Sequence, residues 1–204
     1  MGKKEHWDTI YSQKAEADLS WHQDDPSVSL ELMELAGLTP GTSVVDIGAG
    51  RSRVVDRLLE LGLTDITVLD LSASAIAASQ SRLDDSALDV NWIVADVTTW
   101  DASRAFDIWH DRAVFHFLVD PADQAAYVER LTGSLVNGGH AVIATFALDG
   151  PDKCSGLDVQ RYSPDALSET LGNNFALLGH RFHLHRTPGG RPQSFQYSLF
   201  HKNQ

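Results

Sequence analysis

The sequence predicts an α/β fold with a doubly wound, mostly parallel sheet. Three observations predict it: short β-branched runs alternate with helical patterns from Val44 onward, a glycine turn follows the first of these runs, and two strand-like runs close the chain. Strand-to-helix alternation produces crossover connections, which place parallel strands side by side. With 204 residues, 43% of them hydrophobic, the chain can bury one full core, so we expect a single domain.

The elements of the central part follow in regular order. Strands are expected at 44–47 (VVDI), 66–70 (ITVLD), 90–96 (VNWIVAD), 106–110 (FDIWH) and 141–146 (AVIATF). Apolar residues at helical spacing follow the first strand, and Ser72 is suited to cap a second helix that runs to about Leu83. Asp120-Pro121 is expected to start a third helix, which ends at Asn137-Gly138-Gly139.

Both ends of the chain differ from this pattern. Residues 1–40 predict a helical cover over one end of the sheet, broken around Asp24-Asp25-Pro26. Residues 41–147 hold the alternating core. Residues 148–204 predict a loop, a short helix opened by Ser163-Pro164, and a terminal antiparallel hairpin around Pro188-Gly189-Gly190.

Charge and composition exclude several classes of function. A net charge of -12 repels phosphate backbones, so we expect no nucleic-acid partner. No stretch approaches the roughly 20 apolar residues that span a bilayer, and the first residues lack a signal peptide, so we expect a cytoplasmic protein with no membrane partner. Cys154 is the single cysteine, and His180, His183 and His185 are expected to be solvated strand residues, so we expect no metal site.

The turn in VVDIGAGRS, residues 44–52, is typical of a ligand-binding loop. A dinucleotide fingerprint requires a third glycine, and a P-loop requires Gly-Lys followed by Ser or Thr; neither follows Gly50. Asp46 stands just before the glycines, where it would repel a pyrophosphate and attract the ammonium group of an amino-acid ligand. The turn therefore favours a cationic ligand over a dinucleotide.

Two further acids end neighbouring strands. Asp70 ends the second strand, where a carboxylate can accept hydrogen bonds from a ribose diol. Asp96 ends the third strand, where it can accept a hydrogen bond from an adenine amine while the backbone at Val97 meets a ring nitrogen. Each of these acids can instead cap a turn. Read together, ribose, adenine and an amino-acid tail make S-adenosylmethionine.

These motifs resemble those of the seven-stranded, class I S-adenosylmethionine-dependent methyltransferases. The resemblance runs from about Val44 to Phe146 through VVDIGAG, ITVLDLS, IVADV and FDIWHDRAVFHF, and it implies a seven-stranded sheet with a cofactor-binding core at 41–147. The chain departs from the pattern at Ser52, where many members carry a third glycine. The implied cofactor-binding residues are Asp46, Gly48, Ala49, Gly50, Asp70, Leu71, Asp96, Val97, His110 and Asp111.

The acceptor side is less determined. Tyr11, Trp21 and Phe115 are candidates to line the pocket, because aromatic faces attract a sulfonium by cation–π interaction, although they can equally be core residues. Asp111 and His116 are the candidate catalytic bases for an amine or hydroxyl acceptor. Arg161 and Tyr162, in the loop of the acceptor side (148–204), are candidate substrate contacts.

Three functions remain open at this stage. The acidic chain without an evident docking domain favours methyl transfer to a small molecule. The alternatives are a protein lysine methyltransferase, which the Trp7 and Tyr11 spacing also resembles, and a non-catalytic subunit that only binds S-adenosylmethionine. The sequence specifies neither the methyl acceptor nor the oligomeric state.

Overall fold

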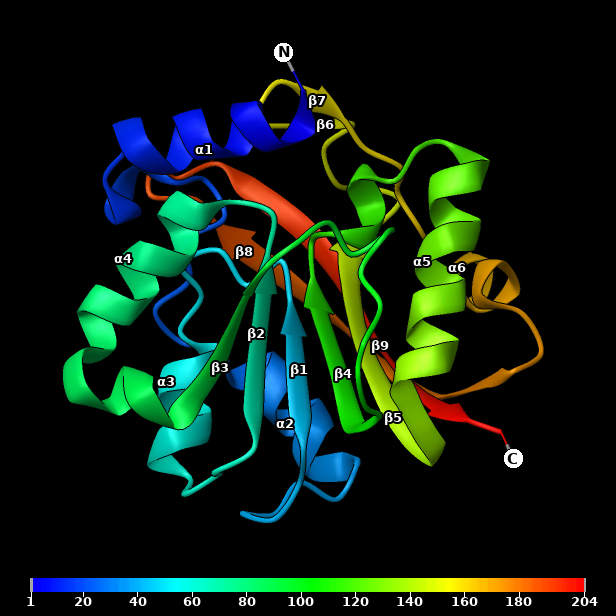
Figure 1. The fold of residues 1–204 in the computed structure, drawn as a ribbon. Coiled ribbons are helices and arrows are strands. Elements are labelled where there is room, and N and C mark those ends of the chain that lie inside the picture. Colours follow the sequence, from blue (N-terminus) through cyan, green and yellow to red (C-terminus); the bar gives the residue numbers. More distant parts are fainter. Residues whose placement is uncertain (1, 204) are drawn as a thin grey trace.

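Residues 2–203 are described by a computed structural model, in which seven strands form one sheet with helices on both faces (Figure 1). The strand order is β3-β2-β1-β4-β5-β9-β8, with β1 to β5 parallel and β9 antiparallel to both of its neighbours. This order confirms the predicted fold class. The strands are β1 (Val44–Ile47), β2 (Ile66–Asp70), β3 (Val90–Val94), β4 (Phe106–Arg112), β5 (Leu135–Phe146), β8 (Phe175–Arg186) and β9 (Pro192–Lys202).

The helices begin where the sequence provides capping groups. The Ser72 and Ser163 hydroxyls accept the amides of Ala75 and Ala166, 3.2 and 3.1 Å away, as N-caps do. The helices are α1 (Lys3–Gln13), η1 (Glu16–Asp18), α2 (Ser27–Leu35), α3 (Val54–Glu60), α4 (Ala73–Leu83), η2 (Asp84–Asp89), η3 (Phe115–Phe117), α5 (Pro121–Ser134) and α6 (Pro164–Leu171). A small hairpin of β6 (Lys153–Cys154) and β7 (Leu157–Asp158) lies between β5 and α6.

The sheet separates two hydrophobic cores because strand side chains alternate between faces. Val44 and Ile108 pack with α2 and α3 on one face, whereas Val45 and Trp109 pack with α5 and α6 on the other. All four side chains are buried. Both faces of the parallel strands are therefore apolar, as the continuous apolar runs in the sequence require.

Several predicted boundaries differ from the structure. The strand expected at 90–96 ends at Val94, and the strand expected at 106–110 runs to Arg112. The helix after Asp120 ends at Ser134 rather than at Asn137-Gly138-Gly139, and β5 begins at once with Leu135. Leu135 pairs with Phe106 and His140 pairs with Ile108, so the Asn-Gly-Gly run is an irregularity inside the strand pair rather than a helix end. Gly138 has a φ of +80°, a left-handed conformation that a glycine adopts at such a bulge without strain.

The N-terminal segment is divided between two places. Helix α1 lies across the edge of the sheet where the parallel strands end (Figure 1). Helix α2 instead packs on a face of the sheet, against β5 and β9, so the helical cover predicted over one sheet end is α1 and η1. His185, expected to be solvated, is buried, and its Nε2 lies 2.9 Å from the Ser20 carbonyl oxygen. No helix within residues 2–203 is long and apolar enough to cross a membrane.

Candidate active site

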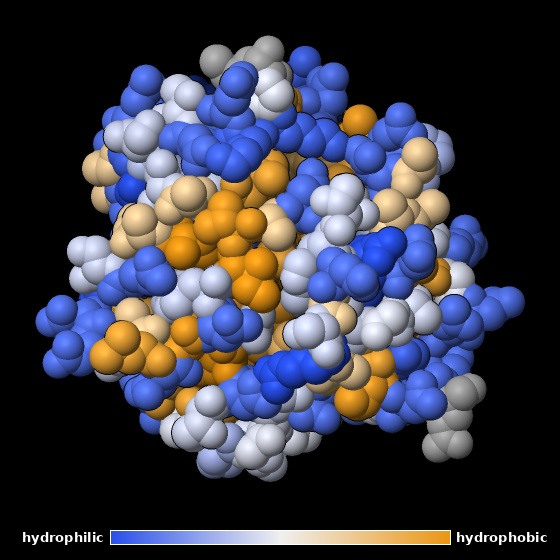
Figure 2. Space-filling view, viewed as in Figure 1, coloured by the Kyte–Doolittle hydropathy of each residue, from blue (hydrophilic) through white to orange (hydrophobic). Residues whose placement is uncertain are grey.

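The loops after β1 and β4 open at the same edge of the sheet, because these two parallel strands are neighbours whose crossovers run in opposite directions. Two adjoining cavities lie there, below α1. They share five lining residues: Tyr11, Trp21, Ile47, Gly48 and Arg112. Figure 2 shows apolar residues gathered below α1 on the face it presents, with hydrophilic residues around them.

The larger cavity holds the predicted ribose and adenine residues together with an aromatic wall. Asp70, Leu71, Asp96 and Val97 line it from the ends of β2 and β3. The remaining wall includes several aromatic rings, together with His116 and Cys154. The aromatic rings belong to Trp7, Tyr11, Trp21, Phe117, Phe146 and Phe195.

The smaller cavity contains the acid that precedes the glycines. Asp46 is buried, and its Oδ1 lies 2.6 Å from His110 Nδ1, while His110 Nε2 lies 2.9 Å from the Ser29 hydroxyl. Asp46 Oδ2 is also buried, but it has no hydrogen-bond partner among the described residues. A buried carboxylate oxygen without a donor is energetically costly, so this atom is suited to receive the cationic group of a ligand.

The glycines of the turn leave room for side chains from other parts of the chain. Gly48 and Gly50 have φ values of +58° and +56°, and a Cβ on either would overlap a side chain: Val114 at Gly48 and Tyr11 at Gly50. The close approach that the glycines predicted is therefore made at least partly by α1 and by the turn after β4. Arg51, next in the loop, donates hydrogen bonds to the carbonyl oxygens of Tyr11 and Lys14, which ties the loop to α1.

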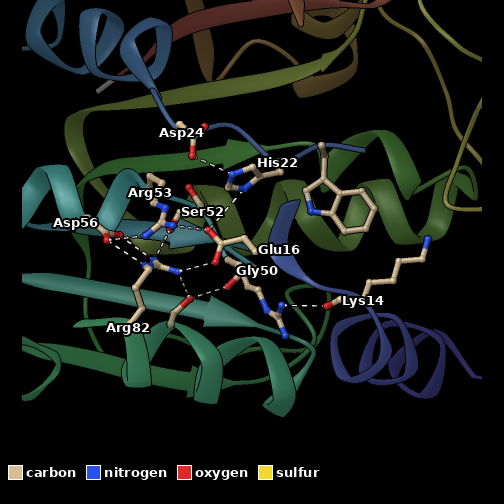
Figure 3. A network of polar contacts seen from close by, with 12 residues as sticks. Lys14, Glu16, His22, Asp24, Gly50, Ser52, Arg53, Asp56 and Arg82 are labelled. Atoms are coloured by element: carbon tan, nitrogen blue, oxygen red, sulfur yellow. Dashed lines mark hydrogen bonds and ion pairs between the residues drawn. The ribbon is translucent and has the colours of Figure 1, made fainter. Parts of the chain in front are cut away.

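A second network holds the segment that follows α1 (Figure 3). Glu16 lies between Arg53 of the loop, at 2.8 Å, and Arg82 of α4, at 3.9 Å. Arg82 also pairs with Asp56 at 2.8 Å, and His22 lies 3.0 Å from Asp24. The cover is therefore fixed by ionic contacts to Arg53, which follows the glycine turn, and to α4.

Asp70 and Asp96 each make a local turn contact and also face the cavity. Asp70 accepts the amides of Gly50 and Ser72, both at 2.7 Å, and burial raises its pKa to about 6. Asp96 Oδ1 accepts the amide of Thr98 at 2.9 Å. The turn-forming role and the ligand-binding role are thus compatible, because a carboxylate has more acceptor sites than these bonds use.

Asp111 lies on the other face of the sheet from Arg112, outside both cavities. Its Oδ1 accepts the amide of Val114 at 2.8 Å, and its Oδ2 accepts the amide of Phe115 at 3.1 Å and the Tyr127 hydroxyl at 2.6 Å. Burial raises its pKa to about 6, yet it lines neither cavity. The expectation that Asp111 serves as a base is not supported by this geometry, since the carboxylate faces α5 and holds the turn after β4.

Three predicted acceptor contacts also lie outside the two cavities. Phe115 is buried against Tyr127 and Tyr162, while Phe117, two residues later, faces the larger cavity. Tyr162 accepts a hydrogen bond from Gln124 at 3.1 Å. Arg161 is exposed and donates to the Gly150 carbonyl at 3.1 Å. The structure therefore does not bring these three residues to either cavity.

His116 does face the larger cavity. Its Nδ1 accepts the amide of Phe146 at 3.3 Å, so the proton of the neutral ring is on Nε2, which is buried without a partner. Burial, with the nearby charge of Arg112 as a smaller cause, lowers its pKa to about 3. In this state His116 offers a hydrogen-bond donor to the cavity rather than a free basic nitrogen.

Arg112 is the residue that the sequence reasoning passed over. It ends β4 and lines both cavities. Strand alternation contained the signal: residues 110 and 112 share one face, and 109 and 111 share the other. Among residues 2–203, no group of three metal-ligating side chains is positioned to hold an ion.

Comparisons with known proteins agree with this geometry. Residues 44–139 match the family of the methyltransferase domain. Over 106 residues the chain is 29% identical to nodulation protein S of Sinorhizobium fredii (strain NBRC 101917 / NGR234), covering 52% of this chain and 48% of that protein. It is 28% identical over 105 residues to EEF1A lysine methyltransferase 2 of Mus musculus, covering 47% of this chain and 43% of that protein. The chain thus spans about half the length of these relatives.

Two solved structures share the fold over almost the whole chain. The N-methyltransferase NodS from Bradyrhizobium japonicum WM9, in complex with S-adenosylhomocysteine, superimposes with a TM-score of 0.74 at 15% identity, covering 98% of this chain and 100% of that one. The 1,6-didemethyltoxoflavin-N1-methyltransferase of Burkholderia thailandensis, with 1,6-didemethyltoxoflavin and S-adenosylhomocysteine bound, superimposes with a TM-score of 0.69 at 21% identity, covering 96% and 81%. At these identities the likeness establishes the fold.

Proposed function

We propose that this chain is a class I S-adenosylmethionine-dependent methyltransferase, which its sheet topology and the match of residues 44–139 to the methyltransferase domain support, and that it transfers a methyl group from S-adenosylmethionine to a small-molecule acceptor. One observation carries the proposal. Side chains from the ends of β1, β2, β3 and β4 converge on two cavities that meet at Gly48. One cavity offers an unpaired buried carboxylate oxygen, and the other offers strand-end acids beside an aromatic wall.

The residues present fit the cofactor. Asp46 Oδ2 would accept the ammonium group of the methionine part, beside the Gly48–Gly50 turn. Asp70 would accept the ribose hydroxyls, and Asp96 with Val97 would bind the adenine, as the sequence analysis expects. Tyr11 and Trp21, which line both cavities, would place aromatic faces near the sulfonium. When bound, S-adenosylmethionine supplies a methyl group that is already activated for displacement.

The chain's own contribution is alignment and exclusion of water. The cover of α1 and η1, fixed by Arg51 and by the Glu16 pairs, closes the carboxyl edge of the sheet over the cavities. Asp111 would position the turn after β4 through its bonds to Val114 and Phe115, rather than remove a proton. An acceptor that is already deprotonated, or that loses its proton to water after transfer, needs no base in this site.

A protein lysine acceptor is the second candidate. The match to EEF1A lysine methyltransferase 2 favours it. The aromatic cavity beneath a fixed cover favours a small acceptor that is enclosed, because a lysine would have to enter from a bulky chain. A subunit that binds the cofactor without catalysis is less favoured, because Arg112 and His116 leave buried donors facing the cavity.

Calorimetry and product detection test the proposal. S-adenosylhomocysteine should bind the purified protein, and NAD should bind far more weakly, since the turn lacks the third glycine of a dinucleotide site. Incubation with S-adenosylmethionine and small-molecule acceptors, then protein acceptors, should yield S-adenosylhomocysteine with small molecules. Tighter binding of NAD would overturn the cofactor assignment. Turnover with proteins alone would overturn the acceptor class, and cofactor binding without turnover on any panel would favour the non-catalytic subunit.

A further inference from the structure

Arg112 is half-buried, and its charge has no counterion among the described residues. Its Nε donates to the Tyr197 hydroxyl and its Nη1 to the Trp21 carbonyl, each at 3.0 Å. Its guanidinium lies over the ring of Phe195, 4.7 Å from the centroid. Nη2 is buried and has no hydrogen-bond partner, and within residues 2–203 no carboxylate lies at ion-pair distance. Leaving this buried N–H donor unpaired costs folding free energy, which a ligand anion would offset.

The backbone beside Arg112 is strained in the same place. Ala113 has a φ of +75°, a left-handed conformation that side chains other than glycine rarely adopt. The conformation is held by the Ala113 amide, which donates to the Ala144 carbonyl at 2.9 Å, and by the Asp111 bond to Val114. Strain of this kind collects at binding sites, where the surrounding structure fixes an unfavourable backbone to aim a side chain.

His116 adds a second unpaired donor to the same cavity. Its Nε2–H is buried without a partner, and its ring is fixed between Phe117 and Phe146, with centroids 4.5 and 4.7 Å away. One charged donor and one neutral donor therefore line a cavity whose other walls include six aromatic rings. That arrangement complements an oxygen anion attached to an apolar group.

The other charged groups that line the cavity do not compete for this position. Lys3 pairs with Asp123 at 2.5 Å. Asp70 and Asp96 lie at the ends of β2 and β3, in the part assigned to the ribose and adenine. The charge of Arg112 acts on the pKa of His116 and of Cys154, whereas the pKa of Asp70 is governed by burial and by its own turn. Arg112 ends β4, whereas Asp70 ends β2 and Asp96 follows β3, so the cation and these two acids come from different strand ends.

We propose that Arg112 and His116 bind the carboxylate of the methyl acceptor, whose remaining part is aromatic or otherwise apolar and packs against Phe117, Phe146 and Phe195. This inference rests on the proposed function, since it names the acceptor class of the same site. The fork of the guanidinium and the imidazole N–H fix the acceptor's orientation before transfer.

The test titrates benzoate, phenylacetate and cinnamate, each against its matched amide, into protein saturated with S-adenosylhomocysteine. At least one acid should bind on the order of ten-fold more tightly than its amide, because a charge-assisted bond is lost in the amide. Arg112→Gln should remove that preference, and Arg112→Lys should retain part of it, because the charge remains and the fork is lost. His116→Phe should weaken the acid less than Arg112→Gln does.

The controls separate this inference from the proposed function. Arg161→Gln removes an exposed arginine outside the cavities and should leave the acid preference unchanged. Affinity for S-adenosylhomocysteine is measured in every variant and should be retained in Arg161→Gln. If S-adenosylhomocysteine binds but no acid binds more tightly than its amide, the inference is wrong and the proposed function stands. If S-adenosylhomocysteine does not bind, the proposed function fails, and acid titrations without it still decide whether Arg112 holds an anion. If Arg112→Gln does not fold, Arg112→Lys decides the test. A preference for the acid over its amide that equals the wild-type preference would contradict binding of the carboxylate by the guanidinium fork.

Discussion

Replacing Gly48 with alanine should destabilise the protein by about 2 to 5 kcal/mol. Gly48 has a φ of +58°, which costs an L-residue roughly 1 to 2 kcal/mol. The added Cβ would also overlap Val114 Cγ2. The Val114 backbone cannot withdraw easily, because its amide donates to Asp111 at 2.8 Å, so relief of the overlap costs a further 1 to 3 kcal/mol, roughly the range for overpacking.

Urea unfolding of four variants separates the two costs. Gly62→Ala is the matched control, since Gly62 has a φ of +82° and no atom within 4 Å of an added Cβ; it should show the backbone cost alone. Gly48→Ala combined with Val114→Ala should be more stable than the sum of the single changes predicts, by about 1 to 3 kcal/mol. The nearest remaining atom, Val114 Cβ, would then lie 3.4 Å away. If Gly48→Ala costs no more than Gly62→Ala, or if Val114→Ala brings no recovery, the glycine is not required by packing.

Three further outcomes follow from the site. Asp70→Ala should weaken binding of S-adenosylhomocysteine by about 1.5 to 3 kcal/mol, the scale of hydrogen bonds to a charged group, and an unchanged dissociation constant in a folded variant would remove Asp70 from the site. Because burial raises the pKa of Asp70 to about 6, its carboxylate gains a proton and loses acceptor capacity as pH falls through about 6, so affinity should decrease there in the wild type and stay flatter in Asp70→Asn. Deleting residues 1–25 should abolish turnover while circular dichroism still shows a folded core, since Tyr11 and Leu19 form a small cluster apart from the two main cores; full turnover in the deletion would refute the role of the cover.

The alternation of strands and helices was predictable from the sequence because it depends on local periodicity. Apolar residues at spacing two or at helical spacing indicate which faces must be buried, and the caps at Ser72 and Ser163 act within three residues of themselves. The strand-end positions of Asp46, Asp70 and Asp96 follow from the same pattern. Parallel strands bring their carboxyl ends to one edge, so the convergence of these acids on one region was also predictable.

The bulge in β5 shows where local signals were insufficient. Asn137-Gly138-Gly139 is typical of a helix end, but pairing of Leu135 with Phe106 on the neighbouring strand outweighed that preference. The glycine turn was recognised as a close approach, yet only the fold revealed that Val114 and Tyr11 make it.

The direction of each acceptor-side group was decided by residues far away in the chain. Asp111 faces Tyr127 on α5, and Arg112 reaches Tyr197, 85 residues later, on β9. The Phe146 amide, 30 residues from His116, selects the ring nitrogen that carries the proton. Sequence by itself therefore determined the fold class, the strand-end acids and the implied cofactor. The tertiary structure decided which donors face the cavity unpaired, because hydrogen-bond satisfaction depends on partners that only the folded chain brings together.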